Sequence, residues 1–297
     1  MLPFDPTELA RYGGLTLTAR TIVEGFLAGI HRSPFKGFSV EFAEHRPYTP
    51  GDEIRRIDWR AYGKTDRYFV KEYEDETNLT AYLVVDASGS MRYRGKQERS
   101  KFEYAQAVAA SLAYLLLAQL DAVGLVVHDT RVRYHLPPKA SAKHLLGVLR
   151  TLERATPGGE TALAPIWDSL AGRFLPRRGM VMLLSDGFDS AERLGRAVRH
   201  LRHRGHDVML FHILAPEELE FPFTKPTKFR DLERLDRVVP TDTRSLRDDY
   251  LRNVETWRND LRKKMEDVRA DYVLLQTDVP VDRALGAFLA RRRNAKS

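Results

Sequence analysis

The stretch Thr80-Ala-Tyr-Leu-Val-Val-Asp86-Ala-Ser88-Gly-Ser90-Met91 decides the fold prediction. Its first half is a short apolar run that is typical of a buried strand, and the run ends on a carboxylate followed by two hydroxyls. Further apolar runs of this kind follow along the chain and alternate with segments of helical periodicity. Strands that are apolar on both faces and alternate with helices predict a mostly parallel sheet covered on both sides.

The fold class is therefore a doubly wound α/β domain. Because 43% of the 297 residues are hydrophobic, the chain has enough apolar residues for a substantial core. The C-terminal segments continue in the same style and are assigned to the same sheet. Strands are expected at residues 80–86, 122–128, 180–185, 207–213 and 272–276. A hairpin partner of the second strand is expected at residues 132–136, and an extended hairpin within residues 221–240. The expected helices cover residues 98–120, 142–152, 163–174, 191–204, 243–269 and 281–292.

Oxygen-bearing side chains follow the ends of these strands. Asp86, Ser88 and Ser90 occupy one tight loop after the first strand, and Ser185-Asp186-Gly187 ends a later strand. The turn Gly158-Gly-Glu-Thr161 offers a third hydroxyl. Ligands of doubly wound sheets bind at the carboxyl ends of the strands, and hydroxyl and carboxylate oxygens suit a hard cation such as Mg²⁺. The alternative is a loop of serines that cap a helix.

The five oxygen-bearing residues resemble the metal-ion-dependent adhesion site of von Willebrand factor A domains. They occur in the right order and on the expected elements. The resemblance implies a von Willebrand A-like (Rossmann-like) fold in which Mg²⁺, or Mn²⁺ or Ca²⁺, contacts the three hydroxyl residues directly. It also implies that the two carboxylates act mostly through water and that an open position on the cation attracts a partner's carboxylate. The matching positions are Asp86, Ser88, Ser90, Thr161 and Asp186.

The N-terminal part carries a second resemblance, to the bacterial domain-of-unknown-function 58 family, which is often encoded beside MoxR-type AAA+ ATPases. The matching signature consists of Arg46, Tyr48, Pro50, Gly51, Asp52, Arg55, Asp58 and Trp59. Glu53 stands where the family commonly has an Asp, and the likeness extends from about Gly37 over nearly the whole chain. Many relatives carry membrane helices before the signature; this chain resembles the short soluble form.

The signature suggests a division at residue 77. Residues 1–77 would form an irregular N-terminal segment packed against an α/β domain over residues 78–297. Arg46, Asp52, Arg55, Asp58 and Trp59 combine charges with an aromatic ring, which favours a buried clamp of ion pairs between the two parts. Partner binding by the same residues is the alternative.

The net charge of +7 is concentrated in residues 78–215, which also carry the expected site. A basic run over residues 92–101 follows the first loop directly, and Arg193, Arg196 and Arg199 lie along one predicted helix, beside His200, His203 and His206. Nucleic-acid or phosphate binding is therefore an alternative function, although no aromatic platform or recognition motif supports it. A Mg²⁺-dependent hydrolase is a second alternative, but Ser88 stands where phosphoaspartyl hydrolases need a second Asp.

The remaining expectations concern cell context and function class. The chain has no cysteine, which excludes disulfides, thiolate metal sites and cysteine nucleophiles. Neither a signal peptide nor a membrane span is expected, so a cytoplasmic location is predicted. We expect a non-enzymatic adaptor that docks an acidic protein partner through its cation. The family resemblance implies a MoxR-type AAA+ ATPase as that partner.

Overall fold

The computed structural model describes residues 15, 18–19, 21–23, 46–47, 68–70, 79–234 and 236–294. The chain divides into two compact units, residues 28–78 and the remainder. In the smaller unit, strand β1 (Arg46–Pro47) pairs antiparallel with β2 (Phe69–Val70). Arg46 is therefore placed on a strand, whereas the other signature residues, from Tyr48 to Trp59, lie outside the described residues.

The larger unit is built on a six-stranded sheet in the order β10-β7-β6-β3-β4-β5. Neighbouring strands are parallel except for β5, which runs antiparallel to β4 at one edge. The order reverses between β3 and β6, so the topological switch point lies where these two strands end. The strands are β3 (Thr80–Asp86), β4 (Ala122–His128), β5 (Val132–Lys139), β6 (Met180–Ser185), β7 (Asp207–Leu214) and β10 (Asp271–Gln276).

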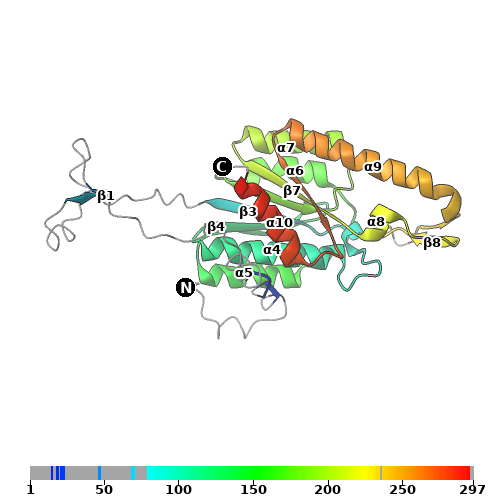
Figure 1. The fold of residues 1–297 in the computed structure, drawn as a ribbon, viewed down its shortest axis with the longest axis horizontal. Helices are drawn as coiled ribbons and strands as arrows, with labels where there is room; N and C mark the ends of the chain where they lie inside the picture. The colour runs from blue at the N-terminus through cyan, green and yellow to red at the C-terminus, as the bar shows by residue number, and fades with distance from the viewer. Residues whose placement is uncertain are drawn as a thin grey trace. The chain divides into compact units, whose positions relative to one another are not determined.

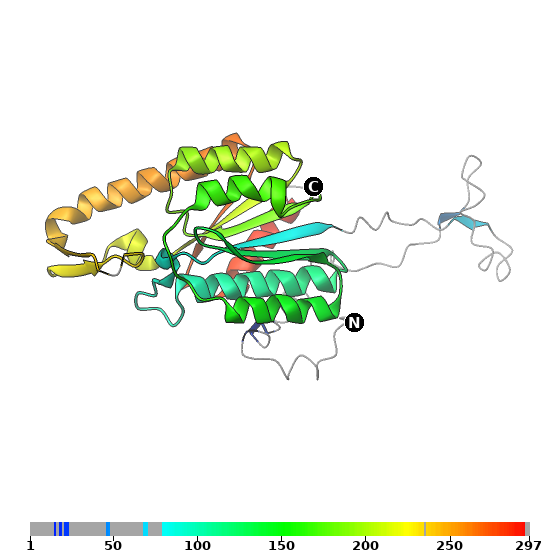
Figure 2. The ribbon, with the colours of Figure 1, turned by 180° about the vertical axis from the view of Figure 1, so that it is seen from behind.

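Helices cover both faces of this sheet (Figures 1 and 2). Helices α4 (Lys101–Ala118), α5 (Ala142–Arg154) and α10 (Val281–Asn294) pack on one face, in a cluster that includes Leu83 and Val85 of β3. Helices α6 (Leu163–Arg173), α7 (Ala191–His203) and α9 (Thr243–Asp267) cover the other face, in a second cluster that includes Tyr82 and Val84. The alternation of β3 residues between two apolar clusters is the reason for its unbroken apolar sequence.

The expected doubly wound α/β fold is confirmed. Strands 80–86, 122–128 and 180–185 have the predicted bounds. Helix α4 begins at Lys101 rather than near residue 98, because Ser100 and Glu103 form a capping box that fixes its first turn. Two short helices were not predicted, a 3-10 turn at Gly89–Arg92 and α8 (Pro216–Glu220). Among the described residues, no helix is both long and apolar enough to cross a membrane.

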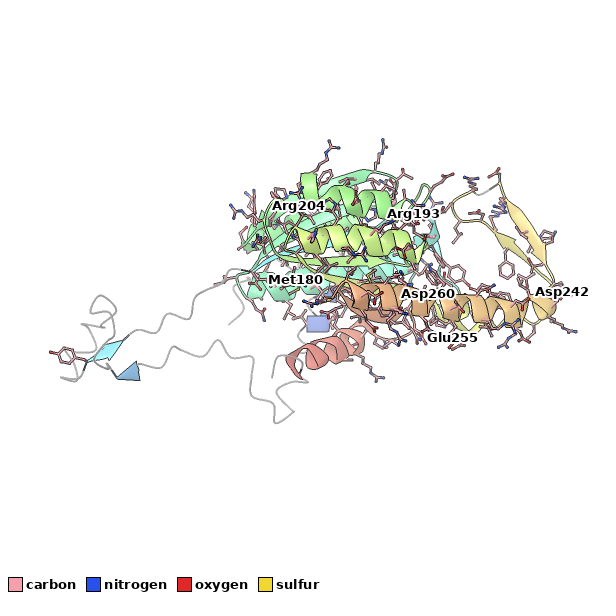
Figure 3. All side chains as sticks on the ribbon, turned by 90° about the horizontal axis from the view of Figure 1, so that it is seen from above. Met180, Arg193, Arg204, Asp242, Glu255 and Asp260 are labelled. Atoms are coloured by element: carbon pink, nitrogen blue, oxygen red, sulfur yellow. The ribbon has the colours of Figure 1, made fainter. Side chains whose placement is uncertain are left out.

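A hairpin arm extends from the carboxyl end of the sheet. Strands β8 (Thr227–Arg230) and β9 (Val238–Thr241) pair with each other in a separate two-stranded sheet. The long helix α9 then returns from Asp242, beside the hairpin, to Asp260, beside α7 (Figure 3). An aromatic cluster holds the base of the arm, with ring centroids 4.5–5.9 Å apart, and it contains Phe221, Phe223, Phe229 and Tyr250.

Strand β5 differs from the other five strands of the sheet. It includes Pro137 and Pro138 directly before its last residue, and its pairing with β4 is irregular between Val123 and Leu125. Proline has no N–H to donate to a sheet, which confines it to edge strands and bulges. The two prolines therefore agree with the position of β5 at the edge.

Candidate functional site

The first loop of the candidate site follows β3 at the switch point. The Asp86 side chain is fully buried, and its Oδ1 accepts a hydrogen bond of 2.8 Å from the backbone N–H of Ser88. The hydroxyl oxygens of Ser88 and Ser90 are 3.0 Å apart, because the 3-10 turn at Gly89–Arg92 brings alternate residues together. One carboxylate and two hydroxyls thus meet within five residues, as the sequence predicted.

The second loop is joined to the first by backbone hydrogen bonds. The N–H of Gly89 donates to the carbonyl of Gly159 over 2.9 Å, and the N–H of Gly158 donates to the carbonyl of Ala87 over 2.8 Å. Gly159 has φ of +80°, a conformation that favours glycine. These contacts place the turn that carries Thr161 beside the first loop.

The third loop follows β6, the strand next to β3. The Ser185 hydroxyl donates to Oδ2 of Asp86 over 2.7 Å and accepts the N–H of Gly187 over 3.0 Å. Asp186 is fully buried, and its Oδ1 accepts the N–H of Phe188. The two expected carboxylates therefore lie at neighbouring strand ends, and Ser185, which was not predicted to have a role, links the two loops.

A buried ion-pair network lies directly beside these loops. The Lys101 ammonium is 2.8 Å from Oδ2 of Asp186 and 2.7 Å from Oε1 of Glu218, and the Lys101 side chain is only 1% exposed. Glu218 belongs to α8 and also accepts the backbone N–H of Ala215. Lys101 was counted in the basic run over residues 92–101, but it is the first residue of α4 and faces inward, where it pairs with acidic groups.

The network contains more negative than positive groups. Burial and the nearby Asp186 carboxylate raise the pKa of Asp86 to about 7. Burial acts to lower the pKa of Lys101, but the Asp186 and Glu218 carboxylates outweigh burial and raise it, so the ammonium stays charged. Three buried or nearly buried carboxyl groups thus share one ammonium. A divalent cation would supply the missing positive charge, and the hydroxyl and carboxylate oxygens of the site are the donors that a hard cation takes.

A second unpredicted carboxylate reaches the site from the hairpin arm. The Thr161 hydroxyl donates a hydrogen bond to Oε1 of Glu233, which lies 72 residues further along the chain. Arg234 pairs with Glu160 in the same turn, with 3.0 Å between Nε and Oε1. Glu233 was not among the predicted site residues, since nothing local in the sequence indicates that this segment meets Thr161.

The three histidines in the last turn of α7 and just after it do not form a metal site. His200 pairs with Asp168, whereas His206 is buried against the Tyr82 ring. Arg193, Arg196 and Arg199 of α7 are exposed, as a basic outer face requires, and Arg193 can be followed in Figure 3. Within the described part of the chain, no three His, Asp or Glu side chains are arranged to hold a metal. The candidate site is not a cluster of this type, because most of its expected ligands are hydroxyls.

Comparison with known proteins gives one family. The model of the family described as "Protein of unknown function DUF58" matches residues 44–260, which is more than half of the chain. Uncharacterized proteins of Mycobacterium tuberculosis and Mycobacterium bovis are 29% identical to this chain over 293 residues, which cover 97% of it and 91% of each relative.

One solved structure shows the same fold, and a second is similar. An aerotolerance-related membrane protein from Bacteroides fragilis superposes with a TM-score of 0.51 at 18% identity, covering 70% of this chain and 96% of that one. A conserved hypothetical protein, BatB, from Bacteroides thetaiotaomicron has a TM-score of 0.49 at 19% identity, covering 74% of this chain and all of that one.

Proposed function

The chain belongs to the DUF58 family, and from the geometry of its site we propose that it is a protein-interaction module. In this proposal a divalent cation, bound at the carboxyl ends of β3 and β6, docks an acidic side chain of a partner. The observation that carries the proposal is the meeting, at the switch point, of three loops that carry two buried carboxylates and three hydroxyl residues. The three loops are joined to one another by hydrogen bonds, which supports a preformed site.

The residues fit a cation by their chemistry. Ser88, Ser90 and Thr161 would hold it through their hydroxyl oxygens, and Asp86 and Asp186 would hold its water molecules. Neutral direct ligands leave much of the cation's charge available, which would attract a carboxylate from outside. Mg²⁺ is the proposed ion because the donors are hard oxygens, and Mn²⁺ or Ca²⁺ would satisfy the same donors.

An exposed aromatic ring adds a contact surface beside the site. Phe188 follows Asp186 by two residues, is 41% exposed and stacks on Trp257 with 5.2 Å between ring centroids. Aromatic residues supported from behind are frequent anchors of protein interfaces. A partner's acidic side chain would reach the cation while a neighbouring apolar group covers Phe188.

The proposed partner is a MoxR-type AAA+ ATPase, with a role in assembling or maturing a protein complex in the cytoplasm. The proposal for this partner rests on the family resemblance, whereas the docking chemistry rests on the site. We propose a binding function without turnover, because Ser88 occupies the position where a hydrolase of this loop type would need a second carboxylate.

The test is a calorimetric titration of the full chain with MgCl₂, followed by capture of the ATPase encoded in the same genome. We expect Mg²⁺ binding and EDTA-sensitive capture by the wild type, and loss of both in Asp86→Ala. Ser90→Ala is the milder variant, since the hydroxyl of Ser90 bonds only to Ser88 in this site. Asp260→Ala, exposed on α9, is the matched control. Failure of the folded wild type to bind Mg²⁺, Mn²⁺ or Ca²⁺ would overturn the proposal.

A further inference from the structure

The tip of the hairpin arm, residues 231–234, lies directly on the candidate site. A Cβ atom added at Gly89 would be 2.7 Å from the carbonyl oxygen of Leu232 and 3.1 Å from Cα of Glu233. Real Cβ atoms do not approach backbone that closely, so the first loop accepts the tip only because residue 89 is glycine. The arm is therefore packed against the loop that carries Ser88 and Ser90.

The side chains of the tip hold the second loop. Glu233 accepts the Thr161 hydroxyl, and the adjacent Arg234 pairs with the adjacent Glu160. Two consecutive residues of the tip thus bind two consecutive residues of the loop. A hydroxyl that donates a hydrogen bond to a carboxylate keeps the lone pairs of its oxygen free, so the Thr161 oxygen remains able to contact a cation.

Hydrogen bonds within the tip fix its conformation. Oδ1 of Asp231 accepts the backbone N–H groups of Glu233 over 2.9 Å and Arg234 over 3.1 Å. Such a turn fixes the direction in which the next side chains leave the backbone. At its base, the arm is held by the aromatic cluster around Phe221. The carboxylate of Glu233 is consequently presented to the site by a braced element.

We infer that Glu233 is an internal carboxylate ligand of the docking site, occupying the position that a partner's acidic side chain would take. The inference rests on the proposed function, because it assigns this residue to the same cation. A partner must then displace the hairpin tip before its own carboxylate reaches the cation. While Glu233 occupies this position, the partner's carboxylate cannot bind there. The apparent affinity for the partner is therefore reduced to the fraction of time for which Glu233 is displaced.

The test uses two probes on the full chain: MgCl₂ alone, and an acetylated, amidated Gly-Glu-Gly peptide, which carries one carboxylate, in the presence of Mg²⁺. Calorimetry measures the affinity for the metal, and the amide resonances of Gly89 and Thr161 report binding of the peptide. We expect Glu233→Gln to lower Mg²⁺ affinity about tenfold or more, because a charged ligand is lost. We expect the same variant to raise peptide affinity at least severalfold. Asp236→Asn, an exposed carboxylate of the same turn, should change neither.

The two outcomes that contradict the proposals are distinct. If Glu233→Gln binds Mg²⁺ and the peptide with wild-type affinities, the assignment of Glu233 is wrong and the docking function stands. If neither the wild type nor Glu233→Gln binds a divalent cation, the docking function fails, and the assignment of Glu233 fails with it. Circular dichroism of each variant confirms that an altered affinity does not reflect unfolding.

Discussion

Replacing Lys101 with methionine should destabilise the fold more than any other single change at the site. Methionine has a similar length, so the change removes the ammonium without leaving a large cavity. The ammonium lies 2.8 Å from Asp186 and 2.7 Å from Glu218, and the side chain is almost fully buried. Its removal leaves these carboxylates and that of Asp86 in a poorly solvated place with no cation from the protein.

The magnitude follows from two opposing contributions. With an effective dielectric constant of about 20, each contact at this distance is worth about 6 kcal/mol of Coulomb energy. Against this stands the desolvation of a buried ammonium, which is several kcal/mol. Removing one member of a buried pair typically destabilises by about 3–5 kcal/mol. We therefore expect a loss of about 3–5 kcal/mol, a large share of the roughly 5–15 kcal/mol that stabilises a domain.

The assay is urea unfolding at pH 7.5 in EDTA, followed by tryptophan fluorescence. Lys96→Met is the matched control, because Lys96 is exposed in the loop before α4, and it should change the stability by less than about 0.5 kcal/mol. Combining Lys101→Met with Glu218→Gln should recover part of the loss, since one uncompensated carboxylate is removed as well. A loss below about 1 kcal/mol in Lys101→Met would refute the reasoning.

Three further predictions concern the rest of the site. Ser185→Ala removes the hydroxyl that donates to Asp86 over 2.7 Å and should lower stability by about 1–3 kcal/mol in urea unfolding; an unchanged midpoint would contradict this. Burial lowers the pKa of His128 from 6.5 to about 4, so as the pH falls the imidazole is protonated first in the unfolded chain. The free energy of unfolding should therefore decline between pH 6.5 and pH 4, and by up to about 3 kcal/mol more in the wild type than in His128→Gln. Parallel pH profiles of the two proteins would show that His128 does not cause the decline. Gly89→Ala should push the carbonyl of Leu232 away and speed hydrogen exchange in the hairpin tip. Unchanged exchange would show that the first loop, rather than the tip, shifts to make room for the methyl group.

Much of the fold could be predicted because burial on both faces of a strand is visible in the sequence. β3 and β6 are short, apolar and bounded by polar residues, so their limits followed from composition alone. The start of α4 was misplaced by three residues, although Ser100 and Glu103 have the spacing of a capping box. The apolar pattern is a weak guide there, since it does not show where the first helical turn closes.

The site could be predicted only where its residues follow strand ends. Asp86 and Asp186 were placed correctly because the ends of neighbouring parallel strands meet at one edge of the sheet. Lys101, Glu218 and Glu233 were not identified, since they reach the site from a helix start, a short helix and a hairpin. Lys101 contacts Asp186 and Glu218, which lie 85 and 117 positions further along the chain. At such separations, sequence spacing carries no information about proximity.

The two prolines of β5 have a consequence for self-association. Successive residues of a strand direct their N–H groups to opposite sides, so two consecutive prolines remove one donor from each side. The outer side of β5 is thus interrupted near its end, and a foreign strand finds an incomplete row of partners there. β10, at the opposite edge, contains no proline between Asp271 and Gln276. Of the two edges of this sheet, β10 is therefore the one where no proline interrupts the row of N–H donors that an added strand would need.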